Sequence, residues 1–363
     1  MKASPQRFEK LRRVMQDQEL DTTVIVPGSN FRYLTASVHF LMERPLLLFA
    51  PKNGQSVVVI PALEYEHFAS HGFDAKPIRW TDQEGYDQAI AAAVAELHLD
   101  GKRIGVEGQL MRYFESLAIQ RHAPNAKIID AHQAISSIRL QKDAEELATQ
   151  RRAVEISEQA LGRTLEEIKV GMTERDIMNI LLAHMSALGA EGFPFEPLVL
   201  AGENSARPHG KVRDDYAIQT GDALLFDFGA TYHGYHADIT RTVFVGEASD
   251  EQRAIYAAVK KANETGHMTA KPGTTAGKVD EQAAQAMRDA GYSDYILHRT
   301  GHGLGLDVHE APFIVKGNDQ LLAPGMVFTI EPGLYVSGTV GVRIEDNVVV
   351  TEDGCESMST FTR

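Results

Sequence analysis

Apolar and polar positions follow different patterns in the two parts of this chain. In the first part, short runs of β-branched and aliphatic residues lie between Pro, Gly or Asn at residues 23–26, 46–50 and 56–60. Such runs predict strands separated by helices, as in a small α/β domain. Beyond residue 136, apolar side chains recur at spacings of seven and four and line one face of a predicted long helix: Leu147, Val154, Leu161, Leu165 and Ile168. The change of pattern predicts an N-terminal domain over residues 1–135 and a second domain over residues 136–363.

Length and composition agree with two folded domains. The chain has 363 residues, which exceeds the roughly 250–300 residues at which a single core usually stops growing. Hydrophobic residues make up 43% of the chain and charged residues 24%. These proportions are those of ordinary globular proteins, so a hydrophobic core is expected in each domain.

The second part of the chain repeats itself weakly at an offset of about one hundred residues. Three pairs of segments match: Arg152-Ala153 with Arg253-Ala254, Lys169 to Thr173 with Lys271 to Thr275, and Gly221 to Gly229 with Gly325 to Gly333. So long a period is not that of a solenoid. It predicts two similar halves, each a helix followed by a β-hairpin, related by a pseudo-twofold axis. Asp227 then corresponds to Glu331, and the functional site is expected between the halves.

Charge and cysteine content exclude several classes of function. The formal net charge of −14 repels phosphate backbones and anionic lipids, so neither a nucleic acid nor a membrane is an expected partner. Cys355 is the single cysteine, which excludes an intrachain disulfide and a thiolate metal cluster. Residues 1–10 have no apolar stretch, and the longest aliphatic run, residues 46–50, is too short to span lipid. We therefore expect a cytoplasmic protein.

Four acidic residues stand in or beside apolar strand patterns of the second part. Asp227 lies in the predicted strand 223–228, and Asp238 lies in the next predicted strand, after a turn at 232–235. Glu331 and Glu345 repeat this arrangement, with Glu345 in the predicted strand 342–350. Hairpins would bring the four carboxylates together, and their repulsion in a low-dielectric cleft must be relieved by protons or cations. Two divalent cations would balance the four charges.

Taken singly, these residues have ordinary structural explanations. One buried carboxylate is as well explained by a satisfied structural role as by a function. His302 stands between glycines in Gly301-His302-Gly303-Leu304-Gly305, where a lone histidine is more often a turn residue than a ligand. The glycines allow close backbone approach and leave the imidazole facing a cavity. Next to four carboxylates, the metal-ligand interpretation is the favoured one.

These residues stand in a series of motifs that resembles one known family. The motifs are Asp227-Phe228-Gly229, His236 to Thr242, Gly301-His302-Gly303 with Val308-His309-Glu310, Ile330-Glu331-Pro332-Gly333, and Arg343-Ile344-Glu345-Asp346. In order and spacing they resemble the family of methionine aminopeptidases, proline-specific aminopeptidases, prolidases and creatinase. The resemblance implies an α+β architecture: a small α/β N-terminal domain followed by a pita-bread domain with duplicated helix and β-hairpin halves. The family's five metal-ligand positions fall on Asp227, Asp238, His302, Glu331 and Glu345.

The resemblance also assigns roles around the metals. His209, in Arg207-Pro208-His209-Gly210, and His309 match the pair that contacts the substrate and the tetrahedral intermediate. His298, Tyr335 and Arg343 match positions of the proline-specific branch. Arg343 is two residues before Glu345 on one strand face, so it could orient that carboxylate. The alternatives are core packing for Tyr335 and a surface charge for Arg343.

The implied reaction is hydrolysis of the peptide bond between a residue Xaa and proline by a metal-activated water. Glu331 is the candidate for carrying the proton to the departing nitrogen. The oxygen-rich ligand set suits two divalent ions, with Mn²⁺ favoured by the resemblance and Co²⁺, Fe²⁺ or Zn²⁺ as alternatives. The extra N-terminal domain favours the proline-specific branch over methionine aminopeptidases, and the five intact ligands favour a peptidase over creatinase. By analogy the protein is expected to be a homodimer. The alternative of another class is a catalytically inactive binding or scaffold protein that keeps the pita-bread fold.

Substrate length stays open between an Xaa-Pro dipeptidase and an Xaa-Pro aminopeptidase. A dipeptidase needs a cation for the free C-terminal carboxylate of its substrate. Some prolidases have an arginine four residues beyond the second motif histidine, but Phe313 stands at that position here. Arg44 or His39 of the N-terminal domain could supply the contact, although both are better explained as surface residues near a strand. Phe313 could be a core residue.

Overall fold

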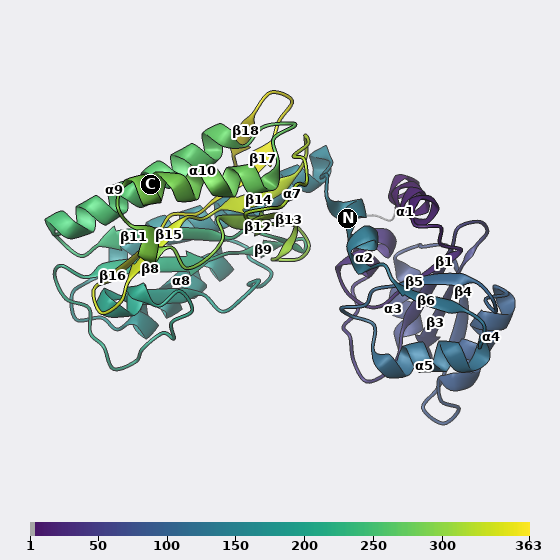
Figure 1. The fold of residues 1–363 in the computed structure, drawn as a ribbon. Coiled ribbons are helices and arrows are strands. Elements are labelled where there is room, and N and C mark those ends of the chain that lie inside the picture. The colour runs from purple at the N-terminus through teal and green to yellow at the C-terminus, as the bar shows by residue number, and fades with distance from the viewer. Residues whose placement is uncertain (1–3) are drawn as a thin grey trace. The chain divides into compact units, whose positions relative to one another are not determined.

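The computed structural model describes residues 4–363, and its internal contacts divide the chain into two units. The first unit ends at Arg139 and the second covers Leu140–Arg363. In Figure 1 the first unit is coloured purple to blue and the second teal to yellow. Residues 1–3, which belong to the N-terminal segment without an apolar stretch, lie outside the described residues. No helix within residues 4–363 has both the length and the apolar character needed to cross a membrane.

The first unit is built on a six-stranded mixed sheet with strand order β4-β3-β2-β1-β5-β6. The three predicted strands are confirmed as β1, β2 and β3, with ends that differ by one residue. The strands are β1 (Thr22–Ile25), β2 (Leu47–Pro51), β3 (Ser56–Pro61), β4 (Ala75–Trp80), β5 (Arg103–Val106) and β6 (Lys127–Asp130). The helices are α1 (Pro5–Asp17), α2 (Ser29–Thr35), η1 (Ala62–Glu64), α3 (Tyr65–Ser70), α4 (Asp87–Glu96), α5 (Tyr113–His122), α6 (His132–Ser136) and η2 (Ser137–Arg139).

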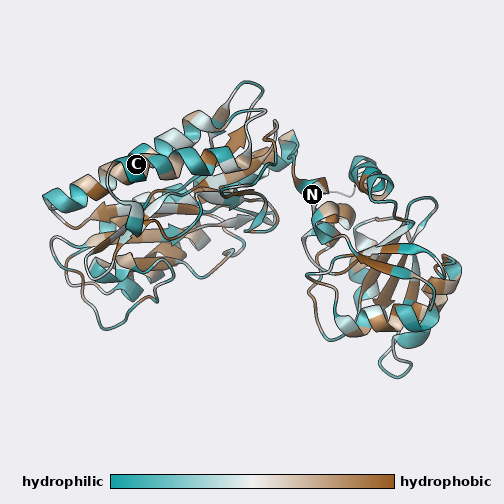
Figure 2. Ribbon diagram, in the orientation of Figure 1, coloured by the Kyte–Doolittle hydropathy of each residue, from teal (hydrophilic) through white to brown (hydrophobic). Residues whose placement is uncertain are grey.

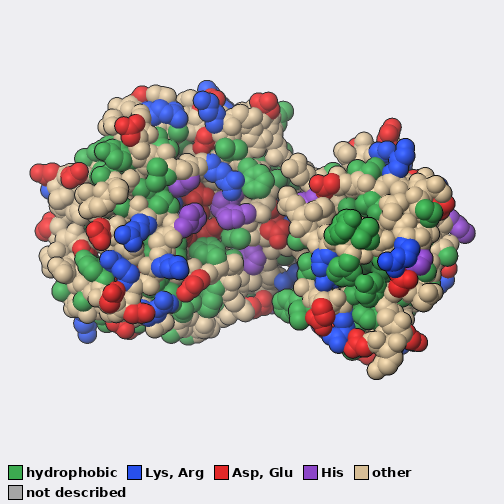
Figure 3. Space-filling view, turned by 60° about the horizontal axis from the view of Figure 1, so that its bottom comes forward, with side chains coloured by type: hydrophobic (Ala, Val, Ile, Leu, Met, Phe, Trp, Pro, Cys, Tyr) green, Lys and Arg blue, Asp and Glu red, His purple; other side chains and the backbone are tan. Residues whose placement is uncertain are grey.

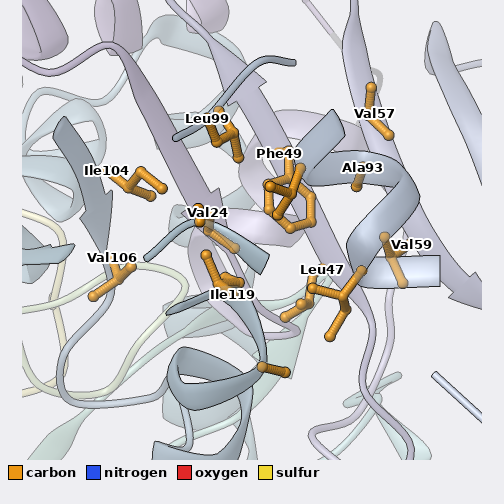
Figure 4. Packing of buried hydrophobic residues seen from close by; sticks show 14 of the residues in the cluster. Val24, Leu47, Phe49, Val57, Val59, Ala93, Leu99, Ile104, Val106 and Ile119 are labelled. Atoms are coloured by element: carbon orange, nitrogen blue, oxygen red, sulfur yellow. The ribbon is translucent and has the colours of Figure 1, made fainter. Parts of the chain in front are cut away.

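A core of buried hydrophobic side chains joins this sheet to helices α4 and α5. Figure 4 shows Val24 and Phe49 of the sheet packed with Ala93 of α4 and Ile119 of α5. Figure 2 shows the same concentration of hydrophobic residues along the strands. The first unit therefore has its own core and matches the predicted small α/β domain.

The long predicted helix begins at Ala144, later than the change of pattern near residue 136. Residues 132–139 form α6 and η2, and Arg139 belongs to the first unit, where its Nε donates to Asn30 Oδ1 at 2.7 Å. Helix α7 (Ala144–Glu167) is capped at its N-terminus by Asp143, whose carboxylate accepts from the Glu146 N–H, and Ile168 lies just beyond its C-terminal end. The cap is the physical reason for the later start, because it satisfies N–H groups that have no partner within the helix.

The predicted duplication of the second unit is confirmed by its element order. Helices α7 and α8 (Glu174–Ala187) precede the first set of strands, and α9 (Asp250–Thr269) and α10 (Ala276–Asp289) precede the second. The matched segments are equivalent, since Thr173 caps α8 and Thr275 caps α10. Each half thus opens with a pair of helices, where a single helix was predicted. The short helices η3 (Gly202–Ala206) and η4 (Ser293–Tyr295) complete the helical part.

The strands of the second unit form curved antiparallel sheets against these helices. The first half contributes the order β11-β8-β7 and the hairpin β9-β10, and the second half contributes β13-β12-β14-β17-β18 and the hairpin β15-β16. The strands are β7 (Leu198–Ala201), β8 (Ala223–Phe228), β9 (Thr231–Tyr232), β10 (Tyr235–His236), β11 (Ile239–Phe244), β12 (Gly301–Gly303), β13 (Glu310–Ile314), β14 (Val327–Ile330), β15 (Gly333–Val336), β16 (Val340–Arg343), β17 (Asp346–Val350) and β18 (Cys355–Ser357).

Candidate metal centre

Three of the four acidic residues stand where a strand ends or is interrupted. Asp227 lies within β8 as predicted, but Asp238 lies in the break between β10 and β11. Glu331 follows the last residue of β14, and Glu345 lies in the break between β16 and β17. The predictions that Asp238 and Glu345 lie inside strands are therefore wrong. Outside a regular strand, side chains need not alternate between the two faces of the sheet. The carboxylates of Asp238, Glu331 and Glu345 can therefore turn towards Asp227.

His302 comes from β12, a three-residue strand whose two other residues are glycines. A Cβ atom at Gly301 would lie 2.0 Å from the carbonyl oxygen of Thr329, and one at Gly303 would lie 2.1 Å from that of Ala311. Only glycine permits so close an approach between neighbouring backbones. The predicted role of these glycines is confirmed, because they let β12 pass between its neighbours with His302 as its one side chain.

The hydrogen bonds of His302 present one ring nitrogen to the acids. Its Nδ1 lies 3.1 Å from the carbonyl oxygen of Gly303, which can only accept, so Nδ1 carries a proton. Its Nε2 lies 3.2 Å from Glu331 Oε1 and 3.6 Å from Asp238 Oδ2. Nε2 is therefore the ring nitrogen that faces the carboxylates, and it is the atom through which His302 would ligate a metal ion.

The five predicted ligands form two overlapping groups of donors. In each group, one atom from every residue lies within 4.8 Å of the others: His302, Glu331 and Glu345 in one, and Asp227, Asp238 and Glu345 in the other. Glu345 belongs to both groups. A third group of the same tightness joins Asp238 and His302 to His309.

Burial and mutual repulsion act on these carboxylates. Burial, then the charges of Glu345 and Asp227, raise the pKa of Asp238 well above its usual value. Burial and the charges of Glu331 and Asp227 do the same to the pKa of Glu345. For Glu331, burial opposes the charged form, but the hydrogen bond and charge of His302 prevail and lower the pKa to about 2. The buried carboxylates therefore repel one another, and a positive charge placed among them would stabilise their ionised forms.

The residues fit a pair of divalent cations. Glu345 is buried, and its Oε1 has no hydrogen-bond partner among residues 4–363, although Oε2 accepts from Thr240 Oγ1 at 2.7 Å. A buried carboxylate oxygen without a partner is costly unless a cation meets it. Four carboxylates and one imidazole without a thiolate are hard to intermediate donors, which suit ions such as Mn²⁺.

Arg343 bonds directly to Asp227 and is linked to Glu345 through a bridging hydroxyl. Its guanidinium donates to Asp227 Oδ2, and its Nε donates to Thr240 Oγ1 at 3.0 Å. Thr240 in turn donates to Glu345, so Arg343 reaches that carboxylate only through the Thr240 hydroxyl. That Arg343 could orient the Glu345 carboxylate stays a prediction, with the Thr240 hydroxyl as the bridge. Arg343 is also buried, so the alternative of a surface charge is excluded.

Tyr335 connects Arg343 to His298. The Arg343 Nη1 donates to the Tyr335 hydroxyl at 2.6 Å. His298 Nδ1 lies 2.7 Å from the carbonyl oxygen of Arg299, which leaves His298 Nε2 to accept from the Tyr335 hydroxyl at 2.8 Å. Burial lowers the pKa of His298, in keeping with this neutral form. Tyr335 therefore takes part in a polar chain and is not merely a packing residue.

The cluster lies in a cavity of about 640 Å³ within the second unit. His209 and His309 both line it, and the His309 ring centroid lies 4.1 Å from that of His302. Burial, then the neighbouring His302 and Arg299, lower the pKa of His309 to about 4. Figure 3 shows histidine side chains beside acidic ones in the middle of one face of this unit. The structure thus brings all ten predicted site residues into one neighbourhood.

Sequence reasoning missed several residues that support the site. Thr240 bridges Glu345 and Arg343. Asn347 accepts from the Asp238 N–H at 3.2 Å and donates back to the Asp238 carbonyl oxygen. Thr329 donates to Glu331 Oε1 at 3.1 Å. Each of these three residues lies two positions from a predicted ligand in the sequence. That spacing was the one sequence feature that could have identified them.

Arg44, His39 and Phe313, which bear on the choice between a dipeptide and a longer substrate, lie in different surroundings. In the first unit, the Arg44 guanidinium pairs with Asp82 at 2.7 and 2.8 Å, and His39 lies 2.9 Å from Ser37 Oγ. Phe313 lies in β13 with 37% of its surface exposed, so the suggestion of a core residue is wrong. The guanidinium carbon of Arg299 lies 4.8 Å from the centre of its ring.

Comparisons with known proteins agree over the whole chain. The family model described as metallopeptidase family M24 matches residues 148–352, and that of the creatinase/prolidase N-terminal domain matches residues 7–141. A protein named Xaa-Pro dipeptidase from Lactobacillus delbrueckii subsp. lactis is 34% identical over 96% of this chain and 95% of its own length. The crystal structure of a prolidase from Thermococcus sibiricus matches with a TM-score of 0.93 and 33% identity, covering 100% of this chain and 98% of that one. An X-Pro aminopeptidase from Thermotoga maritima matches with a TM-score of 0.85 and 31% identity, covering 98% of each chain.

Proposed function

The chain belongs to metallopeptidase family M24, and from this membership we propose that it is a metal-dependent exopeptidase that hydrolyses Xaa-Pro peptide bonds. Relatives that are 33–34% identical over nearly their full length are named Xaa-Pro dipeptidases. The N-terminal domain is the kind shared by creatinase and prolidase. The activity of a metallo-exopeptidase on Xaa-Pro peptides follows from these relationships.

The metals would be held by Asp227, Asp238, His302, Glu331 and Glu345. The observation that carries this assignment is the buried Glu345 carboxylate, which belongs to both donor groups and has one oxygen without a hydrogen-bond partner among the described residues. When bound, two divalent ions supply Lewis acidity that polarises a carbonyl group and acidifies a water molecule. We propose Mn²⁺ as the ion, because the donors are mostly oxygen.

The remaining site residues would position the substrate and move protons. Glu331 is ionised near neutral pH and can accept a proton and deliver it to the departing proline nitrogen. His309 is neutral at that pH, so it can donate a hydrogen bond to a carbonyl oxygen without adding charge. His209 lines the same cavity and is proposed as its partner. Arg343, Tyr335 and His298 form the chain of hydrogen bonds that holds Asp227.

We also propose a cytoplasmic homodimer. Neither property is needed for the donor cluster, which lies wholly within the second unit. Size-exclusion chromatography with light scattering would measure the subunit count.

The activity is tested by removing metal with a chelator, restoring Mn²⁺, and offering Leu-Pro and Leu-Pro-Gly. Release of proline from the dipeptide or of leucine from the tripeptide, only after Mn²⁺ is restored, is the expected result. Absence of metal-dependent turnover with both peptides would overturn the proposal and favour an inactive binding protein with this fold. A set of Leu-Ala peptides serves as the control for specificity towards proline.

A further inference from the structure

The cavity has one guanidinium without a polar partner. Two arginines line it, Arg299 and Arg343. Arg343 is buried and bonded to Asp227, Tyr335 and Thr240. The Arg299 side chain makes no hydrogen bond or ion pair with any residue from 4 to 363, and it is partly exposed. No lysine lines the cavity within that part of the chain.

The histidines of the cavity leave Arg299 as the best available cation. His298 already uses both ring nitrogens, one towards the Arg299 carbonyl oxygen and one towards the Tyr335 hydroxyl, and the His309 ring lies against that of His302. His302 directs its Nε2 at Glu331 and Asp238. An arginine, by contrast, keeps its charge at every working pH and has a planar fork of N–H donors that matches a carboxylate.

Phe313 holds this guanidinium in place. Strands β12 and β13 are antiparallel with Gly301 opposite Ile314, which brings the residues just before β12 next to the end of β13. Ile314 is buried, so the alternation of the strand turns Phe313 to the opposite, partly exposed side. The Arg299 guanidinium lies over the ring, 4.8 Å from its centre. A guanidinium stacked in this way keeps its N–H edge available for a ligand.

We propose that Arg299, supported by the face of Phe313, binds the free C-terminal carboxylate of an Xaa-Pro dipeptide. The positive charge comes from the residue before β12, and the aromatic ring that supports it comes from the neighbouring strand β13. The inference rests on the proposed function and narrows it to dipeptides. In a longer substrate the carboxylate lies at least one residue further on and the proline carbonyl presents no charge to Arg299.

The test compares Leu-Pro with Leu-Pro-amide in the Mn²⁺-loaded protein. Arg299→Ala is expected to raise the KM for Leu-Pro by about 10- to 100-fold, the usual range for a lost hydrogen-bonded charge pair, with kcat changed far less. The wild type should cleave the amide poorly, and Arg299→Ala should not worsen it. Arg299→Lys keeps the positive charge but lacks the planar fork of N–H donors, so its KM for Leu-Pro should lie between those of the wild type and Arg299→Ala. Arg299→Ala/Phe313→Arg should recover much of the KM for Leu-Pro, since it places a guanidinium on the residue that contacts the Arg299 side chain in the wild type.

Matched variants and substrates separate the possible failures. Arg288→Ala, at an arginine of α10 outside the cavity, should leave both substrates unaffected. If Arg299→Ala lost activity equally on Leu-Pro and Leu-Pro-amide, the carboxylate assignment would be overturned. A loss of activity confined to Asp-Pro and Glu-Pro would overturn it too, because Arg299 would then contact the Xaa side chain. Wild type that turns over neither dipeptides nor tripeptides with Mn²⁺ would overturn the proposed function, and this inference with it.

Discussion

Arg363 Nε donates to Asp346 Oδ2 at 2.7 Å. Asp346 is completely buried and directly follows Glu345 in sequence. Its other oxygen accepts from Arg241 Nη2 at 2.8 Å, and the same guanidinium donates from Nη1 to the Glu345 carbonyl oxygen at 2.6 Å. His267 Nε2 lies 3.0 Å from Asp346 Oδ2. The backbone of Glu345, which belongs to both donor groups, is thus held by an ionic cluster formed by Asp346, Arg241, Arg363 and His267.

Asp346→Asn should destabilise the fold strongly. The substitution leaves the buried Arg241 guanidinium without its counter-charge, and breaking one side of a buried ion pair costs about 3–5 kcal/mol. Urea unfolding of the metal-free protein measures the loss. Asp353→Asn, in the exposed turn after β17, should stay within about 0.5 kcal/mol of the wild type. A loss of similar size in both variants would contradict the role given to the cluster.

The contribution of Asp346 should disappear in acid. Burial favours the neutral acid, but the hydrogen bond of His267 and the charges of Arg241 and Arg363 prevail and hold the pKa of Asp346 below its unfolded value of 3.8. A carboxyl with a depressed folded-state pKa stabilises the protein above the unfolded value and loses that effect as pH falls below it. The stability gap between wild type and Asp346→Asn should therefore be constant from about pH 7 to 5 and narrow below about pH 4. Comparing the two proteins cancels the titration of the metal-site acids, which both contain.

The single thiol should be nearly inert in the folded protein. Burial raises the pKa of Cys355 to about 11, and Arg363 only partly offsets this. Because the thiolate is the reactive form, alkylation by iodoacetamide near pH 7.5 should be about two orders of magnitude slower than that of a free thiol. Arg363→Ala should slow it further by removing the nearby positive charge. Alkylation at the free-thiol rate without denaturant would contradict this prediction.

The sequence contained enough to predict that the four acids and His302 come together and that the halves are duplicated, because both depend on residue type and spacing. The long helix and the strands holding Asp238 and Glu345 were misplaced at their ends, since a cap at Asp143 and interruptions in the ladder override periodicity. The bridge from Arg343 through Thr240 to Glu345 could not be read from the chain. It depends on side-chain rotamers and on a contact between residues more than one hundred positions apart. The stacking of Arg299 on Phe313 depends in the same way on strand pairing.

Asp238→Asn should separate metal binding from folding. Burial and the charges of Glu345 and Asp227 raise the pKa of Asp238, so its ionised form works against the metal-free fold. Removing that charge should leave the chelator-treated protein at least as stable as the wild type. Adding Mn²⁺ should stabilise the wild type, by about 2.7 kcal/mol at one hundred times its Kd, and the variant much less. Xaa-Pro hydrolysis should be nearly abolished in the variant.

The same comparison applies to Glu331→Gln, with one difference that follows from its surroundings. The pKa of Glu331 is lowered to about 2, because His302 outweighs the effect of burial, so its charge is already compensated and its loss should not stabilise the metal-free protein. Asp319→Asn, at an exposed residue, should match the wild type in stability, metal response and rate. For Asp238→Asn, Glu331→Gln and Asp319→Asn, we would measure thermal unfolding with and without Mn²⁺, the bound metal content and the rate of Xaa-Pro hydrolysis. A full metal response and an unchanged rate in Asp238→Asn and Glu331→Gln would mean that these carboxylates neither hold the ions nor serve the reaction.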